Sequence, residues 1–168
     1  TGDWLSIGYH PKEIPSLFWL IDPLDGTKEF INRSGEFTIN VALVKNMQSI
    51  FGYVAAPAID KIWLSEEQIL KESQKKSIHS DSIVIVKSRS HSSKEDDQFE
   101  QFLKNNGIDH SFMSVGSSLK ICMLATNKAD LYIRFGPTSE WDIAAANAVL
   151  EAHNCLLYTS DAADEITG

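Results

Sequence analysis

The first half of the chain alternates apolar and polar residues in the way that predicts β-strands. Leu17 to Ile21 is a continuous apolar run, and Phe37 to Val44 alternates apolar residues with small or polar ones. After a turn near Lys45 and Asn46, Ile50 to Ala55 and Lys61 to Leu64 extend the pattern. We therefore expect four strands in an antiparallel meander.

The second half predicts strands and helices in alternation. Ser82 to Val86 is β-branched, and Ser92 with Glu95 forms a capping box ahead of a helix that ends at Gly107. The pattern continues with strands at Phe112 to Val115 and Leu131 to Phe135, helices at Ser117 to Thr126 and Trp141 to Ala152, and a candidate strand at Leu156 to Ser160. An antiparallel half followed by an alternating half predicts a layered α/β architecture. Trp19 and Trp141 are expected to pack in its core.

Composition limits the classes of function. The 168 residues are 43% hydrophobic with a mean hydropathy of -0.16, which suits a packed soluble core. A net charge of -8 argues against a nucleic-acid-binding surface, and no apolar run is long enough for integral membrane contact. Cys122 and Cys155 are isolated, so neither a disulfide framework nor a zinc site is indicated. We expect a cytoplasmic protein, with peripheral contact to the inner membrane left open, and the sequence indicates no oligomeric state.

The segment Asp22 to Phe30, which reads D-P-L-D-G-T-K-E-F, carries the clearest chemistry. Two carboxylates three residues apart follow a buried-type strand, and oxygen ligands of this kind favour Mg²⁺ or Mn²⁺ over zinc. The Leu24 carbonyl is a further candidate ligand. Gly26 and Thr27 are suited to a phosphate, through backbone amides at a helix start and a hydroxyl that orients water. The pattern indicates metal-dependent phosphate-ester hydrolysis.

This segment has two other interpretations. Asp-Pro and Asp-Gly pairs are ordinary turn formers, so D-x-x-D-G alone is weak evidence for a site. A calcium loop requires acids at alternate positions and a glutamate at its twelfth position, whereas these acids are three apart with a proline between them. The calcium loop is excluded by spacing, and the structural turn stays open on the motif alone.

Longer motifs carry a family resemblance. Trp19 to Phe30, Gly35 to Leu43 and Glu140 to Ala146 closely resemble the inositol monophosphatase superfamily, over nearly the whole chain up to about Glu151. Within it, Lys28 to Phe30, Ser88 to His91, Gly116 to Lys120 and Arg134 to Thr138 resemble the CysQ-type branch. The resemblance implies a sugar phosphatase fold and a cytoplasmic 3'(2'),5'-bisphosphate nucleotidase of sulfate assimilation, which converts adenosine 3',5'-bisphosphate to AMP and phosphate.

The resemblance also implies roles for single residues. Asp22, Asp25, Asp142 and the Leu24 carbonyl match metal ligands, and Thr27 matches the residue that helps to activate the attacking water. The remaining matches are to substrate contacts, which the family shares with some of the metal ligands: Asp25, Gly26, Thr27, Ser88, His91, Gly116, Ser117, Lys120 and Asp142. His91 as a loop residue and Lys120 as an exposed helix cation stay open as alternatives, and Arg134 is not assigned to the site.

The chain also departs from the family pattern. A G-E-E or S-E-E glutamate expected upstream of Asp22 is absent from Thr1 to Ser6, and we attribute its absence to truncation. We expect a phosphatase domain over 1–151 that is truncated at its N-terminus. Residues 152–168 are expected to be an atypical tail, foreign or incomplete, because His153 to Leu156 stands where the family has glycines and a T-D turn.

Two alternatives to the nucleotidase are left open. One is a sister phosphatase that acts on inositol monophosphate or fructose 1,6-bisphosphate, whose members more often carry N-F after the D-G-T-x step. The other is a non-catalytic metal-binding or phosphate-binding fragment, which the missing glutamate makes plausible.

Overall fold

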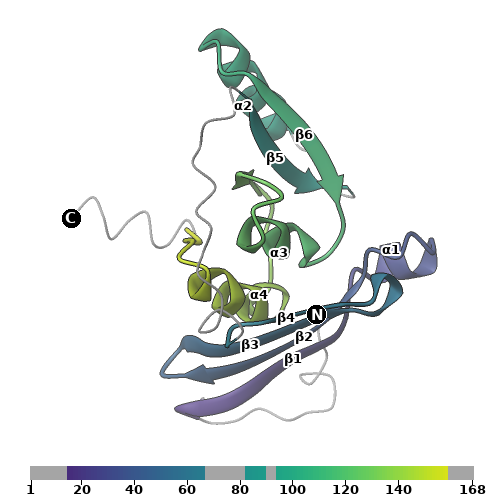
Figure 1. Cartoon of the computed structure of the whole chain (residues 1–168), viewed down its shortest axis with the longest axis vertical. Helices are drawn as coiled ribbons and strands as arrows, with labels where there is room; N and C mark the ends of the chain where they lie inside the picture. Colours follow the sequence, from purple (N-terminus) through teal and green to yellow (C-terminus); the bar gives the residue numbers. More distant parts are fainter. Residues whose placement is uncertain (1–14, 67–81, 90–93, 159–168) are drawn as a thin grey trace.

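Four antiparallel strands form the first layer of the computed structural model, which describes residues 15–66, 82–89 and 94–158. The strands are β1 (Leu17–Asp25), β2 (Thr38–Lys45), β3 (Gln48–Ala56) and β4 (Lys61–Leu64), paired in the order β1-β2-β3-β4 (Figure 1). Asn46 and Met47 make the tight β2–β3 turn at φ values of 50° and 64°, a conformation that suits asparagine. The short 3₁₀ helix η1 (Pro57–Ile59) precedes β4. The predicted meander is confirmed.

A second, parallel sheet is built from the alternating half of the chain. It comprises β5 (Ile83–Ser88), β6 (His110–Val115) and β7 (Leu131–Tyr132) in the order β6-β5-β7. Helix α2 (Lys94–Asn105) connects β5 to β6, and α3 (Leu119–Ala125) connects β6 to β7. The α/β prediction is therefore confirmed, with the two sheets at opposite ends of the view and α3 between them (Figure 1).

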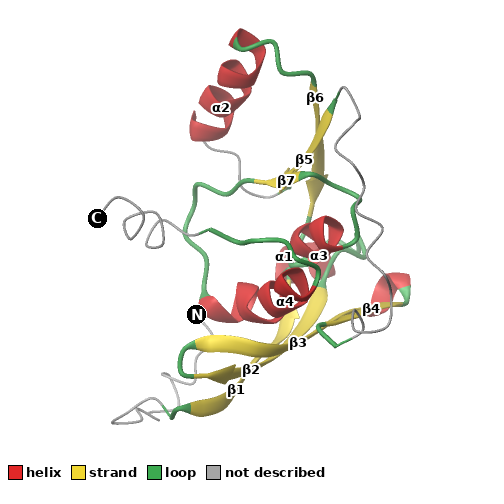
Figure 2. Cartoon of the chain, turned by 60° about the vertical axis from the view of Figure 1, so that its left-hand side comes forward, coloured by secondary structure: helices red, strands yellow, loops and turns green. Residues whose placement is uncertain are grey.

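Helix α4 (Glu140–Ala152) covers one face of the first sheet (Figure 2). The helix approaches β3 so closely that a Cβ atom added to Gly52 would lie 2.0 Å from the Ala145 carbonyl oxygen. Small residues on both elements permit this approach, and Val54, Val149 and Leu150 are fully buried beside it. The helix thereby brings its N-terminus to the end of the sheet where β1 finishes.

The face of the first sheet under α4 is the less apolar of its two faces. Thr38, Asn40 and Ala42 of β2 are buried there, whereas Leu43 points to the opposite face with its cross-strand partner Trp19. Trp19 is 58% exposed, so the prediction that it packs in the core is wrong. The reason is that Trp19 lies on the face of the sheet opposite α4, the only helix that the described residues place on this sheet.

Several expected boundaries change. The strand expected over Leu131 to Phe135 is only two residues long, because the chain leaves the sheet after Tyr132. Residues 156–158 form no strand, while 159–160, the loop expected at 71–81 and the capping residue Ser92 lie outside the described residues. No described helix is both long and apolar enough to cross a bilayer.

Candidate active site

The carboxyl end of β1 carries the first two aspartates. Asp22 pairs with Asn40 of β2 and Asp25 pairs with Thr38, so the register breaks between the two aspartates and β1 bulges there. Pro23 has no N–H to donate, and the Leu24 N–H donates to Asp22 Oδ1 at 3.0 Å. The bulge therefore arises from the sequence Asp-Pro-Leu-Asp itself.

Helix α4 brings the third aspartate to the same place. Ligand oxygens of Asp22, Asp25 and Asp142 all lie within 4.8 Å of one another, although Asp142 is far from the other two in the sequence. Asp142 Oδ2 accepts hydrogen bonds from the Ser139 N–H and the Thr138 hydroxyl, both at 3.1 Å. These bonds fix the carboxylate in the first turn of the helix, where its other oxygen remains for a ligand.

One oxygen of Asp25 is held by four donors. Asp25 Oδ2 accepts the N–H and the hydroxyl of Ser118 at 2.6 and 2.8 Å. It also lies 3.2 Å from the Thr38 hydroxyl and 3.3 Å from Asn40 Nδ2. Among the described residues, the hydrogen bonds of this carboxylate fall on Oδ2, which leaves Oδ1 as the oxygen that can coordinate a cation.

The electrostatics of the cluster favour a cation. Burial raises the pKa of Asp22 most, and the nearby charges of Asp25 and Asp142 raise it further, against the lowering effect of the Leu24 N–H. Three carboxylates at this spacing repel one another, and a hard divalent cation would relieve that repulsion. The donor set of carboxylate oxygens therefore fits the metal ion expected from the sequence.

The turn into α1 (Thr27–Ile31) brings Gly26 and Thr27 beside the aspartates. Gly26 has a φ of 85°, and a Cβ atom there would lie 3.2 Å from both the Glu36 carbonyl oxygen and Ser117 Cβ. The Thr27 hydroxyl lies 3.4 Å from the Leu24 carbonyl oxygen, to which it donates. A helix begins here as the sequence analysis expected, although it is only five residues long.

A cavity of about 230 Å³ opens next to the carboxylates. Most residues that the family resemblance assigns to the substrate line it: Asp25, Gly26, Thr27, Ser88, Gly116, Ser117, Lys120 and Asp142. His91 lies outside the described residues, and Asp22 joins the site through the carboxylate cluster. The structure thus brings together segments from both halves of the chain, and the roles of these residues stay predictions.

Lys120 is a buried cation in the wall of this cavity. Its side chain is 5% exposed, so it is not the exposed helix cation considered from the sequence. Its Nζ atom donates to the Ser117 carbonyl oxygen at 2.6 Å and lies 5.8 Å from the centre of the Tyr132 ring. Burial lowers the pKa of Lys120 from 10.5 to about 8, although the charge of Asp25 acts in the opposite direction. An anion at this position would stabilise the ammonium form.

Sequence reasoning missed several residues of the site. The motif Gly116 to Lys120 gives Ser118 no predicted role, and the alternation in β2 predicts Thr38 and Asn40 only as polar strand positions. Pairing β2 with β1 would have indicated them, because Thr38 lies opposite Asp25 and Asn40 lies opposite Asp22. Arg134, which the sequence analysis does not assign to the site, lines the cavity and donates from Nη2 to the Pro137 carbonyl oxygen at 2.6 Å.

Comparison with known proteins shows the family. Residues 8–163 match the model of the inositol monophosphatase family. The chain belongs to the inositol monophosphatase family. Among relatives in this family, the 3'(2'),5'-bisphosphate nucleotidase CysQ of Salmonella typhimurium is 44% identical over 143 residues, or 80% of this chain and 56% of that protein. The Escherichia coli K12 protein of the same name is 42% identical over 86% of this chain and 60% of its own length.

Solved structures of the family agree with the fold. The crystal structure of CysQ from Bacteroides thetaiotaomicron matches with a TM-score of 0.73 and 36% identity, over 82% of this chain and 59% of that one. An inositol monophosphatase from Anabaena matches with a TM-score of 0.65 at 21% identity, which supports the fold alone. The chain therefore spans between 56 and 60% of the length of these CysQ relatives.

Proposed function

We propose that the protein is a magnesium-dependent 3'(2'),5'-bisphosphate nucleotidase. The observation that carries the proposal is the convergence of Asp22, Asp25 and Asp142 within 4.8 Å, beside a cavity that contains the buried cation Lys120. Carboxylates provide a divalent-cation site, and the cavity wall provides positive charge for an anionic substrate. The relatives named CysQ carry the same activity in their names, which supports this choice of substrate.

The three aspartates and the Leu24 carbonyl would hold the metal. Bound Mg²⁺, or Mn²⁺ in its place, would polarise phosphate oxygens and lower the pKa of a bound water. The protein's own residues then set the geometry: Asp25 is fixed through Oδ2 by Ser118, and Asp142 is fixed through Oδ2 by the start of α4. The Thr27 hydroxyl, at the mouth of the turn, is proposed to orient the attacking water.

The residues that line the cavity provide two kinds of proposed substrate contact. Gly26 and Thr27 lie beside the aspartates and are assigned to the phosphate that leaves. Lys120 and Arg134 bring two cations to the wall of the cavity, and a nucleotide bisphosphate carries a second phosphate that such cations recognise. A substrate with one phosphate offers these two cations no second anionic group, which is the physical reason to favour a bisphosphate.

We also propose that the protein acts in sulfate assimilation in the cytoplasm. Cys122 and Cys155 are both free thiols, which suits a reducing compartment. The proposed partner is a small-molecule nucleotide bisphosphate.

Phosphate release tests the proposal directly. The chain is incubated with Mg²⁺ and adenosine 3',5'-bisphosphate, inositol monophosphate or fructose 1,6-bisphosphate, and Asp25→Asn serves as the inactive control. We expect release from adenosine 3',5'-bisphosphate above the other two substrates, and its abolition in Asp25→Asn. A preference for inositol monophosphate would instead assign the sister activity. Calorimetric binding of the nucleotide without turnover, even after the relatives' upstream segment is added, would favour a binding protein.

A further inference from the structure

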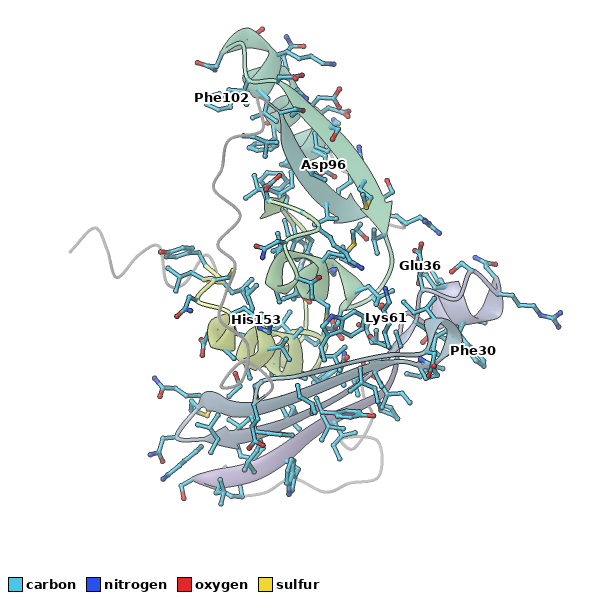
Figure 3. The ribbon with its side chains drawn as sticks, viewed as in Figure 1. Phe30, Glu36, Lys61, Asp96, Phe102 and His153 are labelled. Carbon is cyan, nitrogen blue, oxygen red and sulfur yellow. The ribbon has the colours of Figure 1, made fainter. Side chains whose placement is uncertain are left out.

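The carboxylate of Glu36 joins the two sheets at the edge of the cavity. Glu36 lies between α1 and β2, outside the set of metal ligands, and Figure 3 shows it beside α1 near the end of β6. Its Oε1 atom pairs with Arg89 Nη2 at 2.7 Å, and its Oε2 atom accepts the Gly116 N–H at 2.8 Å. One side chain of the first layer therefore contacts the ends of β5 and β6.

The backbone of Glu36 also packs against two glycines, Gly26 and Gly116. A Cβ atom on Gly26 would lie 3.2 Å from the Glu36 carbonyl oxygen, and one on Gly116 would lie 2.8 Å from it. Added to Gly116, the atom would also approach Glu29 Cγ to 2.5 Å. The phosphate-side turn at Gly26 and the loop at Gly116 thus both pack against the Glu36 backbone, and both close contacts require glycine.

Hydrogen bonds stabilise the loop that carries Glu36. Its N–H donates to the Ser34 hydroxyl at 3.3 Å, and Ser34 donates through its N–H and its hydroxyl to the Glu29 carbonyl oxygen at 3.0 and 3.3 Å. On the other side, Arg89 also donates to the Ser114 carbonyl oxygen at 3.0 Å. A chain of hydrogen bonds therefore runs from α1 through Glu36 to the ends of β5 and β6, two of the three strands of the parallel sheet.

We infer that Glu36 is a positioning residue, which holds the Gly116 loop and the end of β5 at the correct distance from Gly26 and the aspartates. The inference rests on the proposed function, because Ser88, Gly116 and Ser117 are the substrate contacts that it places. The Glu36 side chain is 24% exposed and touches none of the three aspartates in the described contacts. It acts on the nucleotide through the loop, so the metal site is expected to keep its affinity when Glu36 is changed.

Two variants and a matched control test this role. Glu36→Ala removes both hydrogen bonds, whereas Glu36→Gln keeps an acceptor for Gly116 and loses the charge that faces Arg89. The control is Glu100→Gln, which breaks the 2.6 Å ion pair with Lys104 on α2, away from the cavity. Three quantities are compared in the full chain: amide exchange over 114–118, the Kd for adenosine 3',5'-bisphosphate with Mg²⁺, and the Kd for Mn²⁺.

We expect faster exchange at the Gly116 amide in Glu36→Ala, and a nucleotide Kd raised about tenfold, because a hydrogen bond to a charged group is lost. Glu36→Gln is expected to lie between Glu36→Ala and the parent chain, and all variants should keep the Mn²⁺ affinity of Glu100→Gln. Exchange over 114–118 that is unchanged from the control would overturn the inference. If the parent chain binds no nucleotide, the proposed function falls, and the exchange comparison still decides the role of Glu36.

Discussion

Ser118 donates both its backbone N–H and its hydroxyl to a single oxygen of Asp25, at 2.6 and 2.8 Å. The Ser118 hydroxyl also lies 2.7 Å from the Asp142 carbonyl oxygen and accepts a hydrogen bond from Asn40 Nδ2 at 2.9 Å. One buried serine therefore links the strand that carries Asp25 to the helix that carries Asp142. Since both carboxylates are candidate metal ligands, Ser118 fixes their mutual geometry from outside the coordination sphere.

Replacing Ser118 by alanine should weaken metal binding while sparing the fold. Ser118→Ala retains the N–H bond to Asp25 and loses the hydroxyl, so Asp25 gains rotational freedom. Loss of such an outer partner typically costs about 10–100-fold in metal affinity. Titration with Mn²⁺, followed by calorimetry, measures this change.

The matched control for that substitution is Ser111→Ala, on an exposed position of β6. It removes the same hydroxyl group without touching an aspartate, and it should leave the Mn²⁺ Kd unchanged. Equal Kd values for Ser118→Ala, Ser111→Ala and the parent chain would show that Asp25 needs no support from Ser118.

Asp22→Asn is expected to stabilise the metal-free chain and abolish its metal binding. The substitution removes one of three mutually repelling, partly buried carboxylates. If about 1 kcal/mol of repulsion is relieved, the unfolding temperature rises by about 2–4 °C for a chain of this size. Differential scanning calorimetry in a chelating buffer gives the shift, and Asp109→Asn, at an exposed position, controls for the loss of one charge.

The stability gained in Asp22→Asn should depend on pH. The pKa of Asp22 is raised above 3.8, so the folded chain binds a proton more readily than the unfolded chain. The destabilisation is therefore present above the folded pKa and disappears below about 3.8, where Asp22 is neutral in both states. The advantage of Asp22→Asn should shrink as the pH falls through this range, and an advantage that stayed constant would contradict an ionic cause.

Much of the fold was predictable because its signals are local. The alternation in Phe37 to Val44 and the turn expected near Lys45 and Asn46 define a hairpin without knowledge of any distant contact. Which face of that hairpin is buried was not predictable in this way. Helix α4 covers the face of Thr38 and Asn40, since Gly52 and Ala145 allow the closest approach there, and this preference depends on residues nearly a hundred positions apart.

The residues of the candidate site were likewise predictable only where their signal is local in the sequence. The segment Asp22 to Thr27 was recognisable because its ligands lie within a few residues of one another in the sequence, and Asp142 was found only through a family resemblance. Ser118 and Glu36 were missed, because each acts through hydrogen bonds to residues that are distant in the sequence. No periodicity marks such a residue, and only the folded backbone shows that Gly116 needs an acceptor from the first layer.

Nucleotide affinity should fall as the pH rises through about 8, where Lys120 loses its proton in the ligand-free chain. The buried ammonium provides positive charge to the cavity below this pH, and its neutral form does not. Calorimetry with adenosine 3',5'-bisphosphate and Mg²⁺ between about pH 6.5 and 9.5 follows the change, which bound phosphate shifts upward by stabilising the ammonium. Lys120→Arg stays charged and should remove the dependence, while Lys104→Gln on α2 should preserve it.

The stability of the folded chain should rise, rather than fall, as Lys120 loses its proton. Its folded pKa of about 8 lies below the ordinary 10.5, so the unfolded chain binds more protons between these two values. The cost of burying the charge is fully present below about pH 8 and is relieved as the pH approaches 10.5. The difference in unfolding free energy between Lys120→Met and the parent chain should therefore be largest at neutral pH. A difference that grew with rising pH would refute the assignment of a buried ammonium.

Gly52→Ala should destabilise the chain through the contact that brings Asp142 into the site. The new Cβ atom would meet the backbone of α4 at Ala145, only 2.0 Å away, so neither element can yield by rotating a side chain. Overpacking of this kind costs about 3 kcal/mol, and it should also weaken Mn²⁺ binding because α4 moves away from β1. Gly136→Ala is the matched control, because nothing lies within 4 Å of its added Cβ atom. Alanine lowers the conformational entropy of the unfolded chain, so this variant should be more stable than the parent chain by about 0.4–1 kcal/mol. Urea unfolding gives both values, and equal stability of the two variants would mean that α4 does not rest on Gly52.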